Sequence, residues 1–160
     1  RGRDMRWHRL ATLLQVVLLA YWVATEVVDL YPLNDLASRP ADYDLQASIA
    51  VNVLQQLAYM ALFAVGLWWT AAAATVGYGV YLGLQLWTWW VPYLTGVAAD
   101  GADRKLAQFS DTVSVLPVID GRIGPDLQHL VLQTLTALTV LCSAMAARAL
   151  RRARTIDLGP

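Results

Sequence analysis

The sequence predicts an all-α integral membrane protein, a four-helix bundle with both termini cytoplasmic and two structured extracytoplasmic loops. Hydrophobic residues make up 58% of the 160-residue chain, and charged residues only 15%, with a mean hydropathy of +0.45. Soluble domains usually carry about 25% charged residues. No Lys, Arg, Asp, Glu or His lies between Asp44 and Asp100, and that block is about twice the ~20 residues that cross a bilayer once. We therefore treat residues 1–160 as a single transmembrane domain.

Four apolar segments are expected to span the membrane, over residues 10–28, 47–68, 72–93 and 127–147. No charge separates the second segment from the third. A single helix over both would be roughly 75 Å long at 1.5 Å per residue, more than twice the hydrocarbon thickness. The chain must therefore turn, and the sequence WWTAA at 68–72 is the predicted turn because Trp is enriched at membrane interfaces.

The basic residues predict the orientation. Four arginines precede the first span and four follow the last: Arg1, Arg3, Arg6, Arg9, Arg148, Arg151, Arg152 and Arg154. Cytoplasmic segments carry an excess of Lys and Arg, so both termini are expected inside and the two acidic loops outside. Eleven of the twelve basic residues are Arg, which is typical of GC-rich bacterial genomes. We expect a bacterial cytoplasmic membrane.

The second outer loop is too long for a simple connection between helices. Within it, Leu106, Phe109, Val113 and Leu116 recur at helical spacing. This stripe predicts a short amphipathic helix, either on the membrane surface or packed on the bundle, and ended by Pro117. Pro125 and Asp126 then suit the start of the last span, because the helix dipole favours an acid there.

Each span carries polar residues three, four or seven positions apart, which places them on one helical face. In the predicted orientation several of them fall in the outer half of the membrane, where they indicate an outward-facing cavity. Glu26 and His129 are the possible catalytic residues, because ionisable groups inside a membrane are costly and usually functional. The possible ligand-binding residues are Asn52, Gln56, Gln85, Gln133 and Trp89. The alternative is that the amides only join helices and the Trp residues form an interfacial belt.

Small residues recur every four positions along the third span, at Ala71, Thr75, Gly79 and Gly83. The sequence GVYLG matches the small-xxx-small pattern, which lets another helix approach closely. The approaching helix is expected inside this bundle in the simpler case, or in another chain.

Several classes of function are excluded. The formal net charge is zero, so nothing indicates a nucleic-acid partner. His8 and His129 lie at opposite ends of their spans and cannot clasp one haem. No zinc-ligand spacing, Gly-rich phosphate loop or GxSxG sequence is present, and Cys142 is the only cysteine. We expect no cofactor and no metal.

Three functions remain. The first is a non-catalytic accessory subunit of a membrane complex, either a homo-oligomer or a larger assembly within the lipid bilayer. The second is an outward-facing binding protein or transporter for a lipophilic small molecule. The third is a membrane enzyme that uses Glu26 and His129 as an acid/base pair, which requires the two side chains to converge on one substrate.

Overall fold

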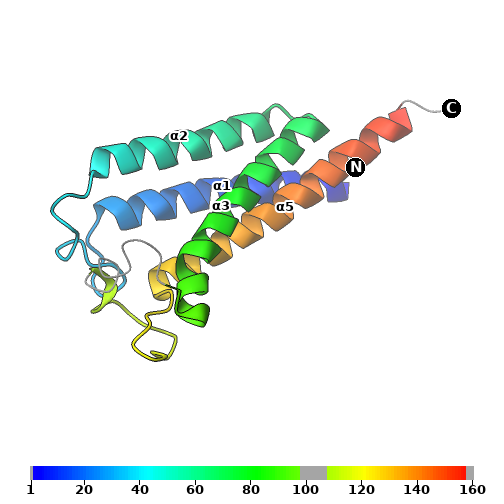
Figure 1. The fold of residues 1–160 in the computed structure, drawn as a ribbon. Coiled ribbons are helices and arrows are strands. Elements are labelled where there is room, and N and C mark those ends of the chain that lie inside the picture. The colour runs from blue at the N-terminus through cyan, green and yellow to red at the C-terminus, as the bar shows by residue number, and fades with distance from the viewer. Residues whose placement is uncertain (1, 98–107, 158–160) are drawn as a thin grey trace.

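The computed structural model describes residues 2–97 and 108–157, in which four helices are joined by irregular loops (Figure 1). The helices are α1 (Gly2–Val27), α2 (Leu45–Ala64), α3 (Trp68–Thr95) and α5 (Leu127–Asp157). The described part contains no strand, only an isolated bridge between Ile119 and Arg122. The all-α prediction is confirmed.

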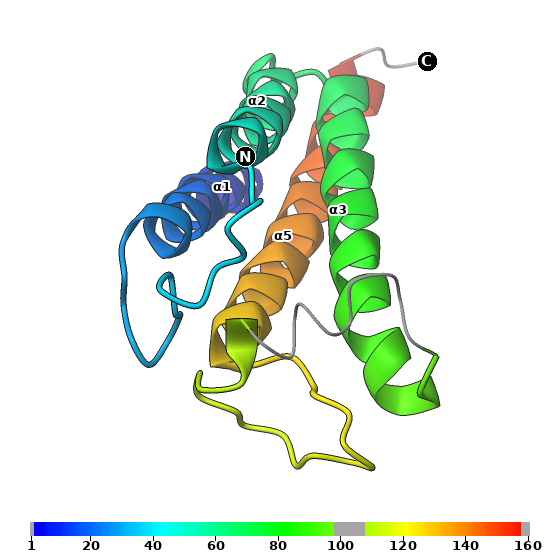
Figure 2. The same ribbon diagram turned by 60° about the vertical axis from the view of Figure 1, so that its left-hand side comes forward.

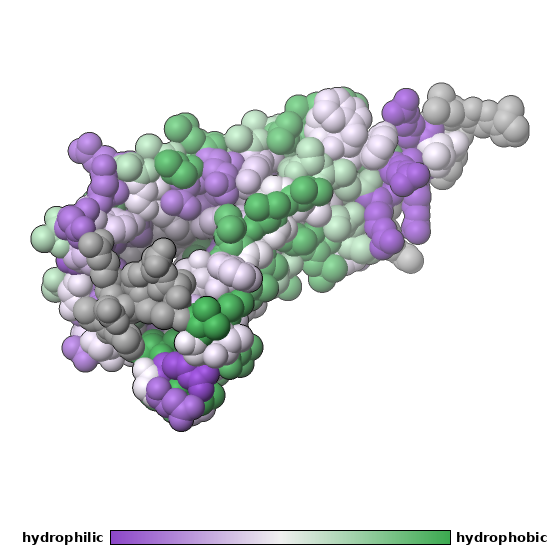
Figure 3. Space-filling view, viewed as in Figure 1, coloured by the Kyte–Doolittle hydropathy of each residue, from purple (hydrophilic) through white to green (hydrophobic). Residues whose placement is uncertain are grey.

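Three of the helices, α1, α2 and α5, are long and apolar enough to cross a membrane. Helix α3 has 28 residues and no charged side chain, but its many Trp, Tyr, Thr and Gly residues lower its hydropathy. The space-filling view shows apolar side chains over the middle of the molecule and hydrophilic ones towards its ends (Figure 3). The prediction of a membrane protein is thus supported by three helices.

Helix α5 is the centre of the molecule, because α1 and α3 both pack against it, while α2 contacts α1 and α3 less extensively. Figures 1 and 2 show α1 beside α2, and α3 beside α5. At one end, here called the loop end, α1 and α3 finish and α2 and α5 begin. The two chain termini lie at the opposite end (Figure 1).

Two clusters of buried side chains form the core. Towards the termini, the small residues Ala11, Ala74 and Ala146 surround Phe63. Nearer the loop end, Leu18, Trp22, Tyr78 and Leu132 pack together. Small side chains let helices approach closely where the hydrophobic effect cannot drive their association.

The turn between α2 and α3 lies earlier than predicted. Helix α2 ends at Ala64 and α3 begins at Trp68, so residues 68–72 are helical and the predicted turn there is wrong. Gly66 has a φ of +75°, a left-handed conformation that glycine adopts without steric cost and that commonly ends helices. The backbone freedom of Gly66, and not the interfacial preference of the two Trp residues, sets the position of the turn.

The amphipathic helix predicted in the second loop falls partly on residues 98–107, among them Leu106, which lie outside the described residues. Phe109 is helical, but residues 110–116 are not, so the prediction is wrong for that part. The backbone there links other segments. The Val113 N–H donates to Pro32 O at 3.0 Å, and the Leu127 N–H donates to Val113 O at 2.9 Å. These bonds join the first loop, the second loop and the start of α5.

Side chains from the loops cap the ends of two helices. After α1, the Asn34 amide donates to Thr25 O at 2.6 Å and Val28 O at 2.9 Å, and accepts from the Leu30 N–H at 2.5 Å. After α3, the Arg122 guanidinium donates to Tyr93 O and Leu94 O, both at 3.2 Å. The final carbonyls of a helix have no partner within it, so these contacts fix the loops against the bundle.

Candidate functional site

A cavity of about 170 Å³ lies at the loop end, and we call it the loop-end cavity. Side chains from the last turns of α1, the first loop, the second loop and the first turns of α5 surround it, and most of its wall is polar. The lining residues are Trp22, Thr25, Glu26, Asn34, Asp35, Leu36, Arg39, Tyr43, Gln108, Phe109, Gln128, His129 and Leu132. Glu26 and His129 therefore line the same cavity.

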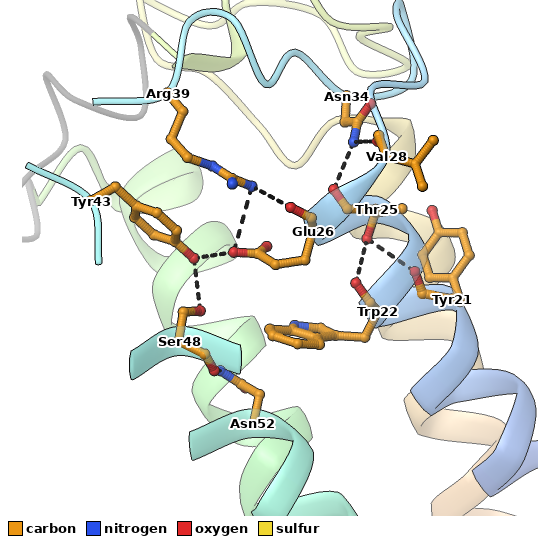
Figure 4. A network of polar contacts seen from close by, with 10 residues as sticks. All are labelled: Tyr21, Trp22, Thr25, Glu26, Val28, Asn34, Arg39, Tyr43, Ser48 and Asn52. Carbon is orange, nitrogen blue, oxygen red and sulfur yellow. Dashed lines mark hydrogen bonds and ion pairs between the residues drawn. The ribbon is translucent and has the colours of Figure 1, made fainter. Parts of the chain in front are cut away.

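Glu26, on the last turn of α1, is held by two residues of the first loop (Figure 4). Arg39 Nη2 lies 3.5 Å from Glu26 Oε1 and donates to Glu26 O at 3.0 Å. The Tyr43 hydroxyl donates to Glu26 Oε1, and the Arg39 guanidinium lies 4.7 Å above the Tyr43 ring. The side chains of Arg39 and Glu26 are only 14% and 13% exposed. At that burial, the pairing offsets the cost of removing two charges from water.

Tyr43 also connects the first loop to α2. Its hydroxyl oxygen lies 2.7 Å from Ser48 Oγ, and the Asn52 amide donates to Ser48 O at 3.0 Å (Figure 4). Burial, followed by the hydrogen bond to Glu26, raises the pKa of Tyr43 above its ordinary value. The phenol therefore stays protonated at neutral pH and can keep donating to the carboxylate.

Asp126 and His129 form a second pair of contacting polar side chains at the start of α5. Asp126 Oδ1 accepts from the backbone N–H of His129 at 2.9 Å and lies 2.6 Å from His129 Nδ1. Thr112 Oγ1 donates to Asp126 Oδ2 at 2.8 Å. Burial acts to raise the pKa of Asp126, but the bonds from His129 and Thr112 outweigh it and lower that pKa. Asp126 is therefore a buried, ionised carboxylate, and it caps α5 as the sequence indicated.

The imidazole of His129 is fixed by aromatic side chains. The Trp89 ring centroid lies 4.0 Å from that of His129, and the Phe109 centroid lies 4.9 Å from it at an interplanar angle of 86°. Trp89 thus supports the cavity wall behind His129. Nδ1 is thus held by Asp126, and no hydrogen bond of Nε2 is seen within the described residues.

Two residues that line the cavity each have a buried atom with unmet hydrogen-bonding capacity. Arg39 Nε and Gln128 Oε1 are buried and have no hydrogen-bond partner among the described residues. Leaving a buried polar atom unpaired costs about 1–3 kcal/mol. Such atoms are normally satisfied by ordered water or a bound molecule. One donor and one acceptor are thus left unpaired on residues that line the cavity.

The remaining residues expected to bind ligand lie away from this wall. The Gln85 amide donates to Thr136 Oγ1 at 3.2 Å, and Gln133 Oε1 accepts from Trp90 Nε1 at 2.8 Å. Both contacts join α3 to α5, which is the interhelical alternative left open by the sequence. Gln56 is fully buried, and neither of its polar side-chain atoms has a partner in the described part.

The stripe of small residues on α3 packs within the chain only in part. Ala71 is buried in the core, and the Thr75 hydroxyl donates to Ala71 O within α3. A Cβ at Gly79 or Gly83 would meet no described atom within 4 Å, so these two glycines have no close helix neighbour in the described part of the chain, and contact with another chain stays a prediction. The close approach is at Gly77 instead, where a Cβ would lie 2.4 Å from the Tyr59 ring.

Sequence reasoning missed Arg39, Tyr43, Phe109 and Thr112. The signals for two of the contacts were present. Arg39 is the only basic residue in the first loop, and Asp126 precedes His129 by three positions, the spacing between a helix-capping side chain and the backbone N–H that it accepts. Thr112 and Phe109 could not be found in this way, because the irregular course of the second loop brings them to the site.

No group of three or more His, Cys, Asp or Glu side chains within residues 2–97 and 108–157 is arranged to hold a metal ion. Compared with protein-family models, curated proteins and solved structures, the chain has no significant match. The chemistry of the loop-end cavity therefore has to be derived from its own residues.

Proposed function

We propose that this is a four-span protein of the bacterial cytoplasmic membrane whose loop-end cavity faces outwards and binds a small polar ligand. The observation that carries the proposal is the pair of unpartnered buried atoms, Arg39 Nε and Gln128 Oε1. Both belong to residues of one cavity that also holds Glu26 and His129.

The fourth span and the orientation rest on length and charge. The 28 uncharged residues of α3 are more than the ~20 needed to cross the hydrocarbon of a bilayer. Arginines cluster before α1's apolar stretch and at the end of α5, and such clusters stay in the cytoplasm. With four spans, the loop end lies on the outer side, and the cavity is reached from there.

The cavity favours a small polar ligand over the lipophilic one expected from the sequence. Its volume of about 170 Å³ is below the roughly 300–1,000 Å³ of pockets for drug-sized, mainly apolar ligands. The ligand needs an acceptor to meet Arg39 Nε and a donor to meet Gln128 Oε1. Glu26 and His129 already have protein partners and would help to orient the ligand.

The test is to identify the small molecules that leave the protein on denaturation, after gentle purification from its own membrane. Gln128→Leu removes the free acceptor while keeping a similar volume, and should reduce the bound molecule roughly tenfold. Gln46→Leu, an exposed position on α2, is the matched control and should retain it. Equal recovery from both variants, or no specific molecule from the wild type, would contradict the proposal.

A second function, the non-catalytic accessory subunit, is favoured by one observation on α3. Gly79 and Gly83 face space that no described atom fills, beside Val76 and Val80, which are more than half exposed. A helix of another chain could approach there closely. On this account, Gly79→Leu should release co-purifying chains, whereas Val80→Leu on the same face should not. On the cavity account, neither variant changes the recovered small molecule.

A further inference from the structure

We propose that Asp126 and His129 are a proton-accepting pair, in which His129 Nε2 takes a proton from an acidic O–H or N–H group of the bound ligand. The inference rests on the proposed function, because it uses the same loop-end cavity. It adds a reaction to the binding: the site deprotonates its ligand.

The Asp126 carboxylate sets the tautomer of His129. An ionised carboxylate only accepts hydrogen bonds, and Asp126 Oδ1 lies 2.6 Å from His129 Nδ1. Nδ1 must therefore carry the proton of the neutral ring. Nε2 then keeps its lone pair, which makes it the proton-accepting atom.

The capping role of Asp126 does not explain this contact. Capping α5 requires only the bond from the backbone N–H of His129 to Oδ1, at 2.9 Å. The second contact, to the ring, and the bond from Thr112 to Oδ2 orient the carboxylate towards the imidazole. The Trp89 and Phe109 rings hold the other side of the pair in place, so the ring is positioned before a ligand arrives.

The proton transfer is balanced within the cavity. The ligand's O–H or N–H bond breaks, a bond from that proton to Nε2 forms, and the ligand keeps the electron pair. The resulting imidazolium lies against the negative charge of Asp126. Arg39 lines the same cavity, and its positive charge can stabilise the anion that forms on the ligand.

Other ionisable groups also face His129 across the cavity. Glu26 comes from α1, and Asp35, Arg39 and Tyr43 come from the first loop. Glu26 is paired with Arg39 and Tyr43, which leaves Asp126 as the carboxylate that contacts the imidazole. A measurement of the ring must therefore include a Glu26 variant, to separate the two acids.

The first experiment reads the tautomer by NMR, with ¹⁵N-labelled histidine in the full chain. The sequence holds two histidines, so His8→Gln leaves His129 as the only signal. In the neutral ring, the proton should be on Nδ1. It should move mainly to Nε2 in Asp126→Ala, which removes the oxygen that accepts from Nδ1–H, but not in Glu26→Gln. An Nε2–H ring in the wild type would overturn the inference.

The second experiment uses diethyl pyrocarbonate, a small reagent that acylates neutral imidazole, with the modified residue identified by mass spectrometry. Nε2 of His129 should react at a pH that leaves the ring neutral, and the reaction at Nε2 should be roughly tenfold slower in Asp126→Ala, where Nε2 mainly carries the proton. Thermal unfolding of each variant shows that it is folded. Modification of His8 alone would overturn the inference. Neither the NMR spectrum nor the acylation experiment requires a ligand. A ring protonated at Nδ1 with a reactive Nε2 therefore supports the inference even if no molecule co-purifies.

Discussion

At the scale of single residues, Asn34 holds the first loop against α1. Its side chain makes three hydrogen bonds to backbone groups just before and after the end of α1, and is almost completely buried. Asn34→Ala leaves one N–H and two carbonyls without these bonds. Each is worth about 1 kcal/mol, so stability should fall by about 2–3 kcal/mol. Tryptophan-fluorescence unfolding in detergent measures this. Asp29→Ala, an exposed neighbour, is the control, and an equal melting temperature for both would contradict the assignment.

Asp126 should make stability depend on pH in acid. Its folded pKa is lowered from the ordinary 3.8, so the ionised carboxylate stabilises the fold above that pH. The contribution disappears as the pH falls from 3.8 through the lowered folded value. Asp126→Asn should therefore cost about 1–3 kcal/mol at pH 7.

The difference between Asp126→Asn and the wild type should shrink progressively below about pH 4. Thermal unfolding of the two proteins, compared across pH, checks this. As a control, Asp29→Asn should have the same melting temperature as the wild type at both acidic and neutral pH. A constant difference at all pH values would show that the charge of Asp126 is not responsible.

The sequence identified Glu26 and His129 but not their partners. An ionisable residue inside an apolar span stands out because burying it there is costly. Arg39 and Thr112 lie in polar loops, where such residues are ordinary. Tertiary contacts, such as the backbone hydrogen bond between Val113 and Pro32, determine which loop residues reach the cavity. Sequence periodicity and residue spacing do not reveal such contacts.

At the scale of helices, the four long helices were predictable because hydrophobic length is a strong signal, whereas the positions of their ends were less predictable. The predicted spans at 10–28 and 127–147 correspond to α1 and α5, which extend further at their charged ends. Gly66 shows why the turn was misplaced. A single residue in the left-handed conformation ends α2, and the apolar residues around it gave no sequence pattern that marks a helix end. Along α3, Gly77 rather than Gly79 or Gly83 lies against another helix of the described chain.

Gly77 should be the position where α3 tolerates no side chain. A Cβ there would lie 2.4 Å from the Tyr59 ring, which itself packs edge-on against Tyr78. Gly77→Ala should therefore cost about 1–3 kcal/mol through overpacking. Gly79→Ala has open space and should be neutral or slightly stabilising, because Ala favours a helix over Gly. Equal melting temperatures for the two variants would contradict the α2–α3 packing.

At the scale of the whole molecule, the orientation can be tested with single cysteines. Native Cys142 is buried and should not react with a membrane-impermeant maleimide in intact cells. Ala37→Cys and Ser114→Cys, exposed in the two loops, should be labelled. Thr155→Cys, exposed near the end of α5, should be labelled only after the cells are opened. Labelling of Thr155→Cys in intact cells would place the termini outside.

The loop-end cavity unites the three scales. Charged side chains line it, and some of them lie at the end of α1 and the start of α5. The proposed four-span arrangement would open the cavity to one side of the membrane. We propose that a small polar ligand in this cavity satisfies Arg39 Nε and Gln128 Oε1.

The most direct measurement is a high-resolution structure of the protein purified gently from its own membrane, with any accompanying chains identified by mass spectrometry. The account predicts non-protein density between Glu26 and His129, within hydrogen-bond distance of Arg39 Nε and Gln128 Oε1. A closed loop end, in which protein side chains meet those two atoms and leave no space, would contradict it.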